Sequence, residues 1–267
     1  MLVARMNMQI FVINLVKDVD RREHITRQLN NLGLQYEIVP GIFGAGLSPE
    51  DRLRHYDDSK AKWRYSRSLV SAEIGCALSH LKVYREIETR GIGCALVLED
   101  DVVLPPDLAP FLSNCEEVLD LESPEVWLLS PARVKEGAVG RKLLRQGRSV
   151  LPFRSGAYTS SYILTATAAR ALVAELYPVG DVADCWRRLQ RYGVVELFVV
   201  TPPLIEQNQK DFGSSTTADY RRHVGNDYVT RLAYKARRTR TVIWELFYAP
   251  YRRLTRQHPT YRISVRK

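Results

Sequence analysis

Residues 94–101 have the sequence Cys-Ala-Leu-Val-Leu-Glu-Asp-Asp, in which a short apolar run ends abruptly in three carboxylates. An apolar run of this length, without alternation, is typical of a strand that is buried on both faces of a sheet. In open α/β sheets, ligands bind in the crevice at the carboxyl ends of the strands. The placement of Glu99, Asp100 and Asp101 therefore predicts a binding site where this strand ends.

Other apolar runs alternate with helical patterns on both sides of this strand. Strands are predicted at residues 10–15, 36–39, 125–129, 158–164 and 194–200, and helices at about 20–32, 74–91, 107–119, 168–176 and 184–190. Strands that alternate with helices indicate an α/β sandwich with a mostly parallel central sheet. The polar stretch 44–67 is rich in charge and has little periodicity, and no element is predicted there.

The charge divides the chain into two parts. Residues 221–267 contain 13 Lys or Arg and two acidic residues, a net charge of +11. The 39 basic and 30 acidic residues of the whole chain then leave 26 and 28 for residues 1–220, a net charge of −2. We therefore predict a near-neutral globular body, 1–220, followed by a strongly basic C-terminal segment, 221–267. No apolar run reaches the ~20 residues that cross a bilayer, and residues 10–15 are too short for an export signal.

The cysteines are widely spaced and form no Cys-x-x-Cys pair. This pattern predicts reduced, buried thiols in a cytoplasmic protein, and neither a disulfide scaffold nor a zinc site is expected. The four residues are Cys76, Cys94, Cys115 and Cys185.

Several motifs occur in one order and carry a resemblance to a known family. They are Ile13-Asn14-Leu15 with Asp20-Arg21-Arg22, then Glu73-Ile74-Gly75-Cys76-Ala77-Leu78-Ser79-His80, then Val97-Leu98-Glu99-Asp100-Asp101, with further matches at 158–169 and 201–207. In this order they resemble glycosyltransferase family 25, which includes bacterial lipooligosaccharide galactosyltransferases and collagen galactosyltransferases. The resemblance covers roughly residues 8–215, and its specificity comes from the order of several motifs.

The resemblance implies a GT-A-like nucleotide-sugar-binding fold over residues 1–220. It also implies a metal-dependent, inverting transfer of a sugar, most often galactose from UDP-galactose. The expected acceptor is a lipooligosaccharide, a lipopolysaccharide or a related glycan.

The acidic triplet corresponds to the metal and diphosphate site of the family. Asp101 is the expected direct ligand of Mn²⁺ or Mg²⁺, with Glu99 on the same side of an extended backbone, because these cations prefer carboxylate oxygens. The alternative is a solvated acidic loop.

The resemblance also implies a set of donor-binding residues around the first strand and the second motif. Arg21 or Arg22 could meet a phosphate or the uracil carbonyl, and a solvated helix start is the alternative for one of them. His80 lies beside an apolar helix stripe, where a structural role is the alternative. The full set is Asn14, Arg21, Arg22, Ser79, His80, Asp100 and Gln207.

An inverting transfer needs a base that takes the proton of the acceptor hydroxyl. Asp181 and Asp184 both stand near the place where the family often has an acidic residue after a Pro-hydrophobic pair, and the extra Gly180 leaves either alignment open. Asp184 stands directly before Cys185-Trp186, where it could begin a helix with Trp186 near a sugar face. A plain helix N-cap is the alternative role for Asp184.

In the basic segment, Trp244, Phe247, Tyr248 and Tyr251 recur three or four residues apart among arginines. This pattern favours a helix from about residue 225 that docks on an anionic membrane surface, here the inner face of the cytoplasmic membrane. Packing of the aromatic residues against the body is the alternative.

Two other functions are compatible with parts of the sequence. A nucleotidyltransferase of similar topology is weakened by the absence of a glycine-rich phosphate loop after the first strand. A non-catalytic adaptor could use the basic segment on membranes or nucleic acid, but no recognised nucleic-acid motif is present, and no nucleic-acid partner is expected.

Overall fold

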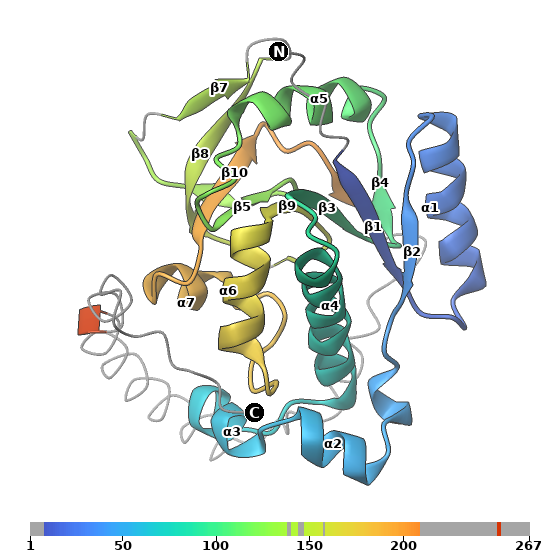
Figure 1. Ribbon diagram of the computed structural model, residues 1–267, viewed down its shortest axis with the longest axis vertical. Coiled ribbons are helices and arrows are strands. Elements are labelled where there is room, and N and C mark those ends of the chain that lie inside the picture. The colour runs from blue at the N-terminus through green and yellow to red at the C-terminus, as the bar shows by residue number, and fades with distance from the viewer. Residues whose placement is uncertain (1–7, 138–139, 144–146, 157, 209–249, 252–267) are drawn as a thin grey trace, which may run out of the picture.

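The computed structural model describes residues 8–137, 140–143, 147–156, 158–208 and 250–251. At its centre is a nine-stranded sheet with the order β2-β1-β3-β9-β5-β10-β8-β6, in which β7 pairs with β8 (Figure 1). The strands are β1 (Gln9–Asn14), β2 (Glu37–Pro40), β3 (Cys94–Glu99), β5 (Glu125–Leu128), β6 (Arg133–Val134), β7 (Arg141–Leu143), β8 (Arg148–Ser155), β9 (Ser161–Thr165) and β10 (Glu196–Thr201).

The direction of the strands confirms the predicted α/β sandwich with a mostly parallel sheet. Strand β1 is parallel to β2 and to β3, and β5 is parallel to β10. Strand β9 is inserted between β3 and β5 and runs antiparallel to both, so β2, β1, β3, β5 and β10 share one direction. Because β9 starts where β3 ends, residues 158–160 lie beside Glu99, and Glu99 N donates to Ser160 O at 2.8 Å.

Both faces of the central strands are buried, as the apolar runs predict. In β1, Phe11 and Ile13 face one core while Ile10 and Val12 face the other, which is the two-residue period of a strand. The first core is shared with α4 (Ser71–Thr89), α6 (Ala166–Leu176) and α7 (Trp186–Arg191), and the second with α1 (Val19–Asn31) and α5 (Leu108–Val118). None of the described helices is long and apolar enough to cross a membrane.

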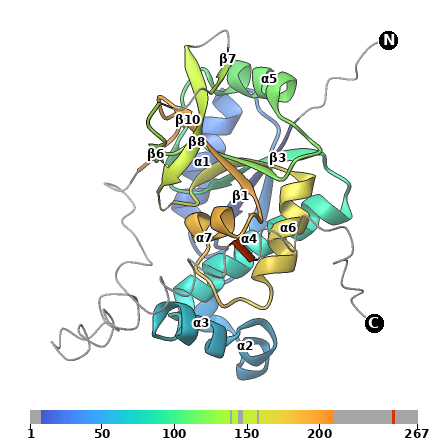
Figure 2. The same ribbon diagram turned by 90° about the vertical axis from the view of Figure 1, so that its left-hand side faces the viewer.

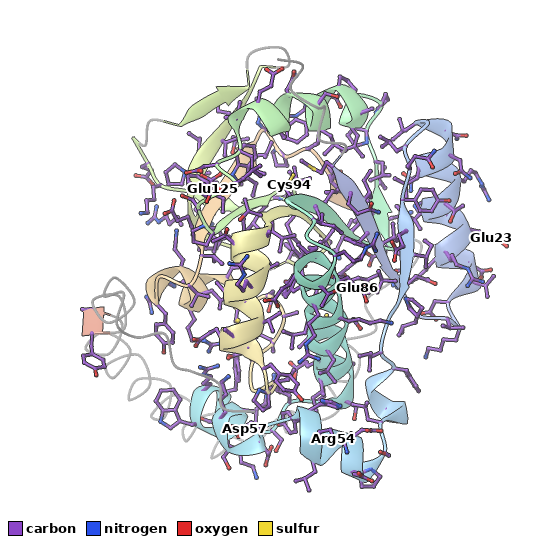
Figure 3. The ribbon with its side chains drawn as sticks, viewed as in Figure 1. Glu23, Arg54, Asp57, Glu86, Cys94 and Glu125 are labelled. Atoms are coloured by element: carbon purple, nitrogen blue, oxygen red, sulfur yellow. The ribbon has the colours of Figure 1, made fainter. Side chains whose placement is uncertain are left out.

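The polar stretch after β2, for which the sequence predicts no particular element, is helical. It contains η1 (Gly44–Gly46), α2 (Pro49–His55) and α3 (Asp58–Tyr65). Ser48 caps α2 by accepting from Asp51 N at 3.0 Å, and Asp57 caps α3 by accepting from Lys60 N at 2.8 Å. Figure 3 shows Asp57 at α3. Figure 2 shows both helices together at one end of the molecule, beyond α4. Side-chain caps stabilise the N-termini of these short helices. The helices have little amphipathic periodicity, so the sequence pattern does not predict them.

The predicted C-terminal segment, 221–267, lies outside the described residues except for positions 250 and 251. Its helix, its membrane docking and the division of the chain at residue 220 stay predictions.

The start of α4 packs closely against the loop after β2. Two facing glycines, Gly44 and Gly75, allow this approach. A Cβ added at Gly75 would lie 2.4 Å from Ile42 O and 2.6 Å from Gly44 N. These are backbone atoms, which cannot swing away as the end of a side chain can.

We predict that Gly75→Ala destabilises the protein, although alanine is the better helix former by about 1 kcal/mol. Overpacking costs about 1–3 kcal/mol, and contact with backbone places this site at the upper end of that range. Urea unfolding should show a net loss of at least about 1 kcal/mol. Gly46→Ala is the matched control, because its added methyl meets only the Phe43 ring at 3.2 Å. Equal stability of the two variants would contradict the close approach.

Candidate active site

The acidic triplet lies at the carboxyl end of β3, where the sequence predicts a site. Asp100 and Asp101 are only 6% and 7% exposed, so the alternative of a solvated acidic loop is wrong. After the triplet, β4 (Val102–Val103) pairs antiparallel with β11 (Glu206–Gln207). This pairing brings Gln207, which is distant in sequence, next to Asp101.

Asp100 joins the ends of β1 and α1 to β3. The Asn14 side chain, which is 2% exposed, donates from Nδ2 to Asp100 Oδ2 at 2.7 Å and to Asp18 O at 3.0 Å. Arg21 Nη1 lies 3.2 Å from Asp100 Oδ1. Burial raises the pKa of Asp100, and the contacts with Asn14 and Arg21 act against this rise. Both Asp100 oxygens are thus engaged within the fold, while Arg22 on α1 makes neither of these contacts.

Asp101 has weaker partners. Its Oδ1 is 3.5 Å from Gln207 Nε2, and its Oδ2 is 3.8 Å from Arg21 Nη1. Burial, followed by the charge of Glu99, raises the pKa of Asp101 to about 6. Such a carboxylate fits a hard divalent cation, because the cation would offset the charge that burial and the neighbouring acids make costly.

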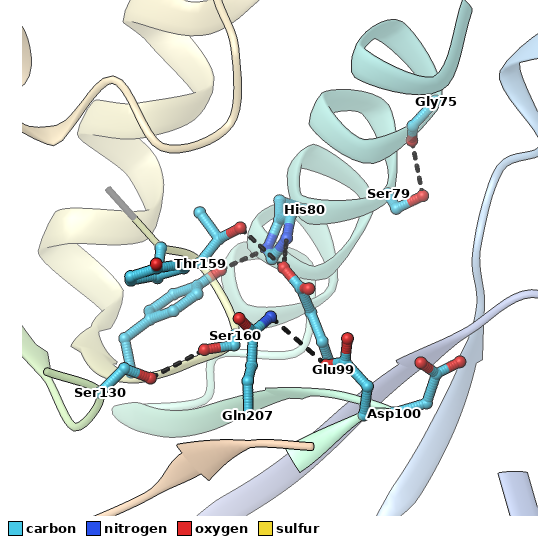
Figure 4. A network of polar contacts seen from close by, with 12 residues as sticks. Gly75, Ser79, His80, Glu99, Asp100, Ser130, Thr159, Ser160 and Gln207 are labelled. Atoms are coloured by element: carbon cyan, nitrogen blue, oxygen red, sulfur yellow. Dashed lines mark hydrogen bonds and ion pairs between the residues drawn. The ribbon is translucent and has the colours of Figure 1, made fainter. Parts of the chain in front are cut away.

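Glu99 is turned toward α4 and not toward β11 (Figure 4). Its Oε1 accepts from Thr159 Oγ1 at 2.7 Å and lies 3.3 Å from His80 Nε2. Burial by itself would raise the pKa of Glu99, but the hydrogen bonds with His80 and Thr159 outweigh it and hold the pKa below its ordinary value. The expected pairing of Glu99 with Asp101 around one metal therefore does not match the direction of the Glu99 side chain.

Ser79 and His80 have different surroundings, although they are adjacent in α4. The Ser79 hydroxyl accepts from Ile42 N at 2.8 Å and donates to Gly75 O at 2.7 Å. Because the Ser79 hydroxyl both accepts and donates a hydrogen bond inside the fold, Ser79 positions the loop after β2. Its hydroxyl is not available to a nucleotide-sugar donor. His80 reaches the triplet through Glu99, and its Nδ1 is 2.7 Å from the Tyr162 hydroxyl.

The structure separates the two candidate bases. Asp181 is 2% exposed and forms ion pairs with Arg64 and Arg188, and it also accepts from the Tyr65 hydroxyl at 3.0 Å. Its carboxylate is thus enclosed by cations, which corrects its assignment as a candidate base. Arg64 and Tyr65 come from α3, in the stretch where no element is predicted, so sequence reasoning missed this network.

Asp184 is half-buried and is not the N-cap of α7, because Cys185 occupies that position and no side-chain cap is formed. Burial raises the pKa of Asp184, and the charges of Glu99 and Glu73 add to the effect. The Asp184 carboxylate therefore lies within electrostatic range of the triplet. Trp186 is fully buried, and its Nε1 donates to Tyr158 O at 3.0 Å, so the expectation that it lies near a sugar face is wrong.

The chain matches the family model described as "Glycosyltransferase family 25 (LPS biosynthesis protein)" over residues 7–186, more than half of its length. The chain therefore belongs to glycosyltransferase family 25, as its motifs predict. The sheet topology and the buried triplet at the end of β3 agree with the GT-A-like fold that the resemblance implies.

Curated relatives match parts of the chain. It is 34% identical over 98 residues to procollagen galactosyltransferase 1-A of Xenopus laevis, which is 35% of this chain and 16% of that protein. It is 36% identical over 101 residues to procollagen galactosyltransferase 2 of Homo sapiens, with the same two shares. A longer match, 28% identical over 174 residues, is to the "probable inactive glycosyltransferase 25 family member 3" of Bos taurus, and covers 62% of this chain and 28% of that protein. The matched segments thus amount to less than a third of the length of these relatives.

Among solved structures, the chain is similar to a glycosyltransferase involved in the glycosylation of the major capsid of PBCV-1. The identity is 11%, and the match covers 62% of this chain and 63% of that one. The TM-score is 0.29, and at this value the likeness carries no argument.

We predict that Asp181→Asn destabilises the protein strongly, because it leaves Arg64 and Arg188 buried beside a neutral side chain. Breaking a buried ion pair by removing one charge costs about 3–5 kcal/mol. Chemical unfolding measures the loss. Glu50→Gln is the control, because its pair with Arg54 is exposed and should contribute little. Similar stabilities of the two variants would contradict a structural role for Asp181.

Proposed function

We propose that this protein catalyses a metal-dependent, inverting transfer of galactose from UDP-galactose to a lipooligosaccharide or a related glycan. The observation that carries the proposal is Asp101 at the carboxyl end of β3 in a family 25 chain, a buried carboxylate whose side-chain contacts with the described residues are 3.5 and 3.8 Å long. The donor is inferred from the names of the curated procollagen galactosyltransferases, and the acceptor from the LPS description of the family.

Asp101 is the proposed protein ligand of Mn²⁺, or of Mg²⁺. Asp100 is occupied by Asn14 and Arg21, and Glu99 is turned toward α4, so Asp101 is the member of the triplet left for the cation, and the diphosphate and water would supply further oxygen ligands. The bound cation supplies positive charge that stabilises the departing UDP.

The donor-binding side of the site is formed by β1, α1 and β11. Arg21 is near both Asp100 and Asp101, and its side chain is 18% exposed, so its guanidinium can also reach a phosphate at this edge. Gln207 lies on the other side of Asp101. Asn14 acts by holding Asp100, and Arg22 stays a second candidate for the donor.

Asp184 is the proposed base. In an inverting transfer, its carboxylate takes the proton of the acceptor hydroxyl while that oxygen bonds to the anomeric carbon and the bond to UDP breaks. Burial raises the pKa of Asp184 above that of an ordinary aspartate and so makes the carboxylate a stronger base.

The basic segment, 221–267, is proposed to hold the protein on the inner face of the cytoplasmic membrane, where a lipid-linked acceptor would be presented. Its charge of +11 supports this role, because each basic residue near an anionic surface contributes about 1 kcal/mol. A non-catalytic family member is the second candidate, and the inactive designation of the bovine relative favours testing it.

We expect Asp101→Asn to lower transfer by about 100-fold or more while the fold is kept, because the amide preserves shape but not the charge that coordinates a hard cation. Activity is measured with UDP-galactose and Mn²⁺, and a thermal shift on adding both measures donor binding. Asp20→Asn, an exposed change on α1, is the control. Full activity of Asp101→Asn, or of the wild type in excess chelator, would exclude the metal role, and no stabilisation by any UDP-sugar would favour the non-catalytic candidate.

We expect Asp184→Asn to lower turnover by roughly 10²–10⁴-fold with an almost unchanged KM for the donor. Because the base acts unprotonated, wild-type kcat/KM should fall as the pH drops through the raised pKa of Asp184, and this limb should disappear in the variant. Asp181→Asn, assayed under conditions in which this variant is folded, is the comparison. If the loss of turnover occurs there instead, the base is Asp181.

We expect the full-length protein to bind vesicles that contain anionic lipid at low salt and to be released as salt rises, because the attraction is electrostatic. Vesicles of neutral phosphatidylcholine are the control. Equal binding to both kinds of vesicle, or to neither, would argue against membrane docking, and retention on RNA alone would favour a nucleic-acid partner.

A further inference from the structure

Three different metal-ligating side chains converge between α4 and the end of β3. They are Cys76, His80 and Glu99, and one ligand atom from each lies within 4.8 Å of the other two. Among the described residues, this is the group of three or more His, Cys, Asp or Glu side chains whose ligand atoms lie this close to one another. Asp101, the proposed ligand of the hard cation, is not a member of it.

The placement of these side chains on the backbone suits a shared ligand. Cys76 and His80 are four residues apart in α4 and therefore lie on the same face of the helix, one turn apart. Glu99 approaches that face from the end of β3 (Figure 4). His80 is buried, whereas Cys76 is half-buried and the Glu99 side chain is 25% exposed, so an approach from solvent remains on the Glu99 side.

The separation of His80 Nε2 from Glu99 Oε1 is 3.3 Å. This is long for a hydrogen bond between charged groups, which is usually about 2.7–2.9 Å. Two ligands about 2.0–2.1 Å from one tetrahedral Zn²⁺ lie roughly 3.3–3.4 Å apart. The observed distance thus matches the edge of a zinc tetrahedron.

The other nitrogen of His80 is held as it is in metal-binding histidines. The Tyr162 hydroxyl donates to the Tyr84 hydroxyl at 2.9 Å, so its oxygen is left to accept from His80 Nδ1–H at 2.7 Å. With Nδ1–H held in this way, Nε2, which is in hydrogen-bond contact with Glu99 when no cation is bound, is the nitrogen whose lone pair a cation would take. A partner that fixes the tautomer through the non-ligating nitrogen is a regular feature of metal-bound histidine.

The surroundings favour a cation. Burial first, and then the charges of Glu99 and Asp184, raise the pKa of the Cys76 thiol well above its ordinary value. The same negative charges attract a divalent cation. On binding, the metal–sulfur bond replaces the S–H bond, and the proton passes to solvent.

We propose that Cys76, His80 and Glu99 form a binding site for a thiophilic divalent cation of the Zn²⁺ class. The site is distinct from that of the hard cation at Asp101, because thiolate and imidazole select Zn²⁺ over Mn²⁺ and Mg²⁺. Three protein ligands leave the fourth tetrahedral position open. If the proposed function holds, Zn²⁺ here inhibits transfer, because its positive charge offsets the negative charge of Glu99, which adds to the rise that burial causes in the pKa of the base Asp184.

Co²⁺ reports on this site without any assay of transfer. The full-length protein, freed of metal by a chelator and then desalted, is titrated with Co²⁺ and followed by absorption. We expect one equivalent to give a thiolate-to-cobalt band in the near ultraviolet and the visible bands of tetrahedral Co²⁺. Zn²⁺ should abolish these bands, and Mn²⁺ should not.

Cys76→Ser should lose the thiolate band and bind Zn²⁺ at least about 100-fold more weakly, since even the loss of an outer partner costs 10–100-fold. Cys115→Ala, a cysteine in the other core, is the control and should keep the band. Asp101→Asn should also keep it, which separates this site from the proposed catalytic metal. If Cys76→Ser does not fold, Glu99→Gln provides the test, with the band kept and the affinity for Zn²⁺ lowered.

Absence of a thiolate band in the wild type, or its persistence in Cys76→Ser, would overturn the proposal and favour an imidazolium–carboxylate pair between His80 and Glu99. A thiolate band in a protein that transfers no sugar would keep the metal site and reject the proposed function. Transfer without a thiolate band would keep the proposed function and reject the metal site.

Discussion

The contact of Asp100 with Asn14 and Arg21 is the constraint on which the candidate site depends. It fastens the carboxyl ends of β1 and β3, and the start of α1, to one buried carboxylate. Without these partners, three adjacent carboxylates at a buried strand end would repel one another at a high cost. Because Asn14 and Arg21 bind Asp100, the contacts of the Asp101 side chain with the described residues are long, and the proposed cation would offset its charge.

The reversed strand β9 gives the two outer members of the triplet different neighbours. A strand that begins where β3 ends brings residues 158–162 alongside Glu99, so Thr159 donates to Glu99 and Tyr162 holds His80. On the opposite side, the pairing of β4 with β11 brings Gln207 to Asp101. Glu99 is thus drawn toward α4 and Asp101 toward β11, although only one residue separates them in sequence.

Strands β1, β2, β3, β5, β9 and β10, the main helices and the position of the triplet could be predicted because local patterns encode them: apolar runs, a two-residue period and a carboxylate cluster at a strand end. The sequence pattern does not predict strands β6, β7 and β8. The direction of Glu99 could not, because it depends on Thr159 and His80, which arrive from other elements. The burial of Asp181 depends on Arg64 and Tyr65, which come from short helices with little apolar periodicity. The spacing of Cys76 and His80 is visible in the sequence, but a search for paired cysteines overlooks a cysteine and a histidine one helix turn apart.

The two proposed cation sites follow from one difference in ligand chemistry. At Asp101, the proposed ligand is a carboxylate oxygen, and a hard cation that retains water and phosphate ligands suits it. Near Glu99, a thiol and an imidazole converge, and a soft cation that accepts sulfur and nitrogen suits them. Glu99 borders both, because its carboxylate belongs to the Cys76 group while its charge raises the pKa of Asp101. A cation bound at Glu99 would cancel part of that charge, so occupation of the soft site would weaken the electrostatic attraction of Asp101 for the hard cation.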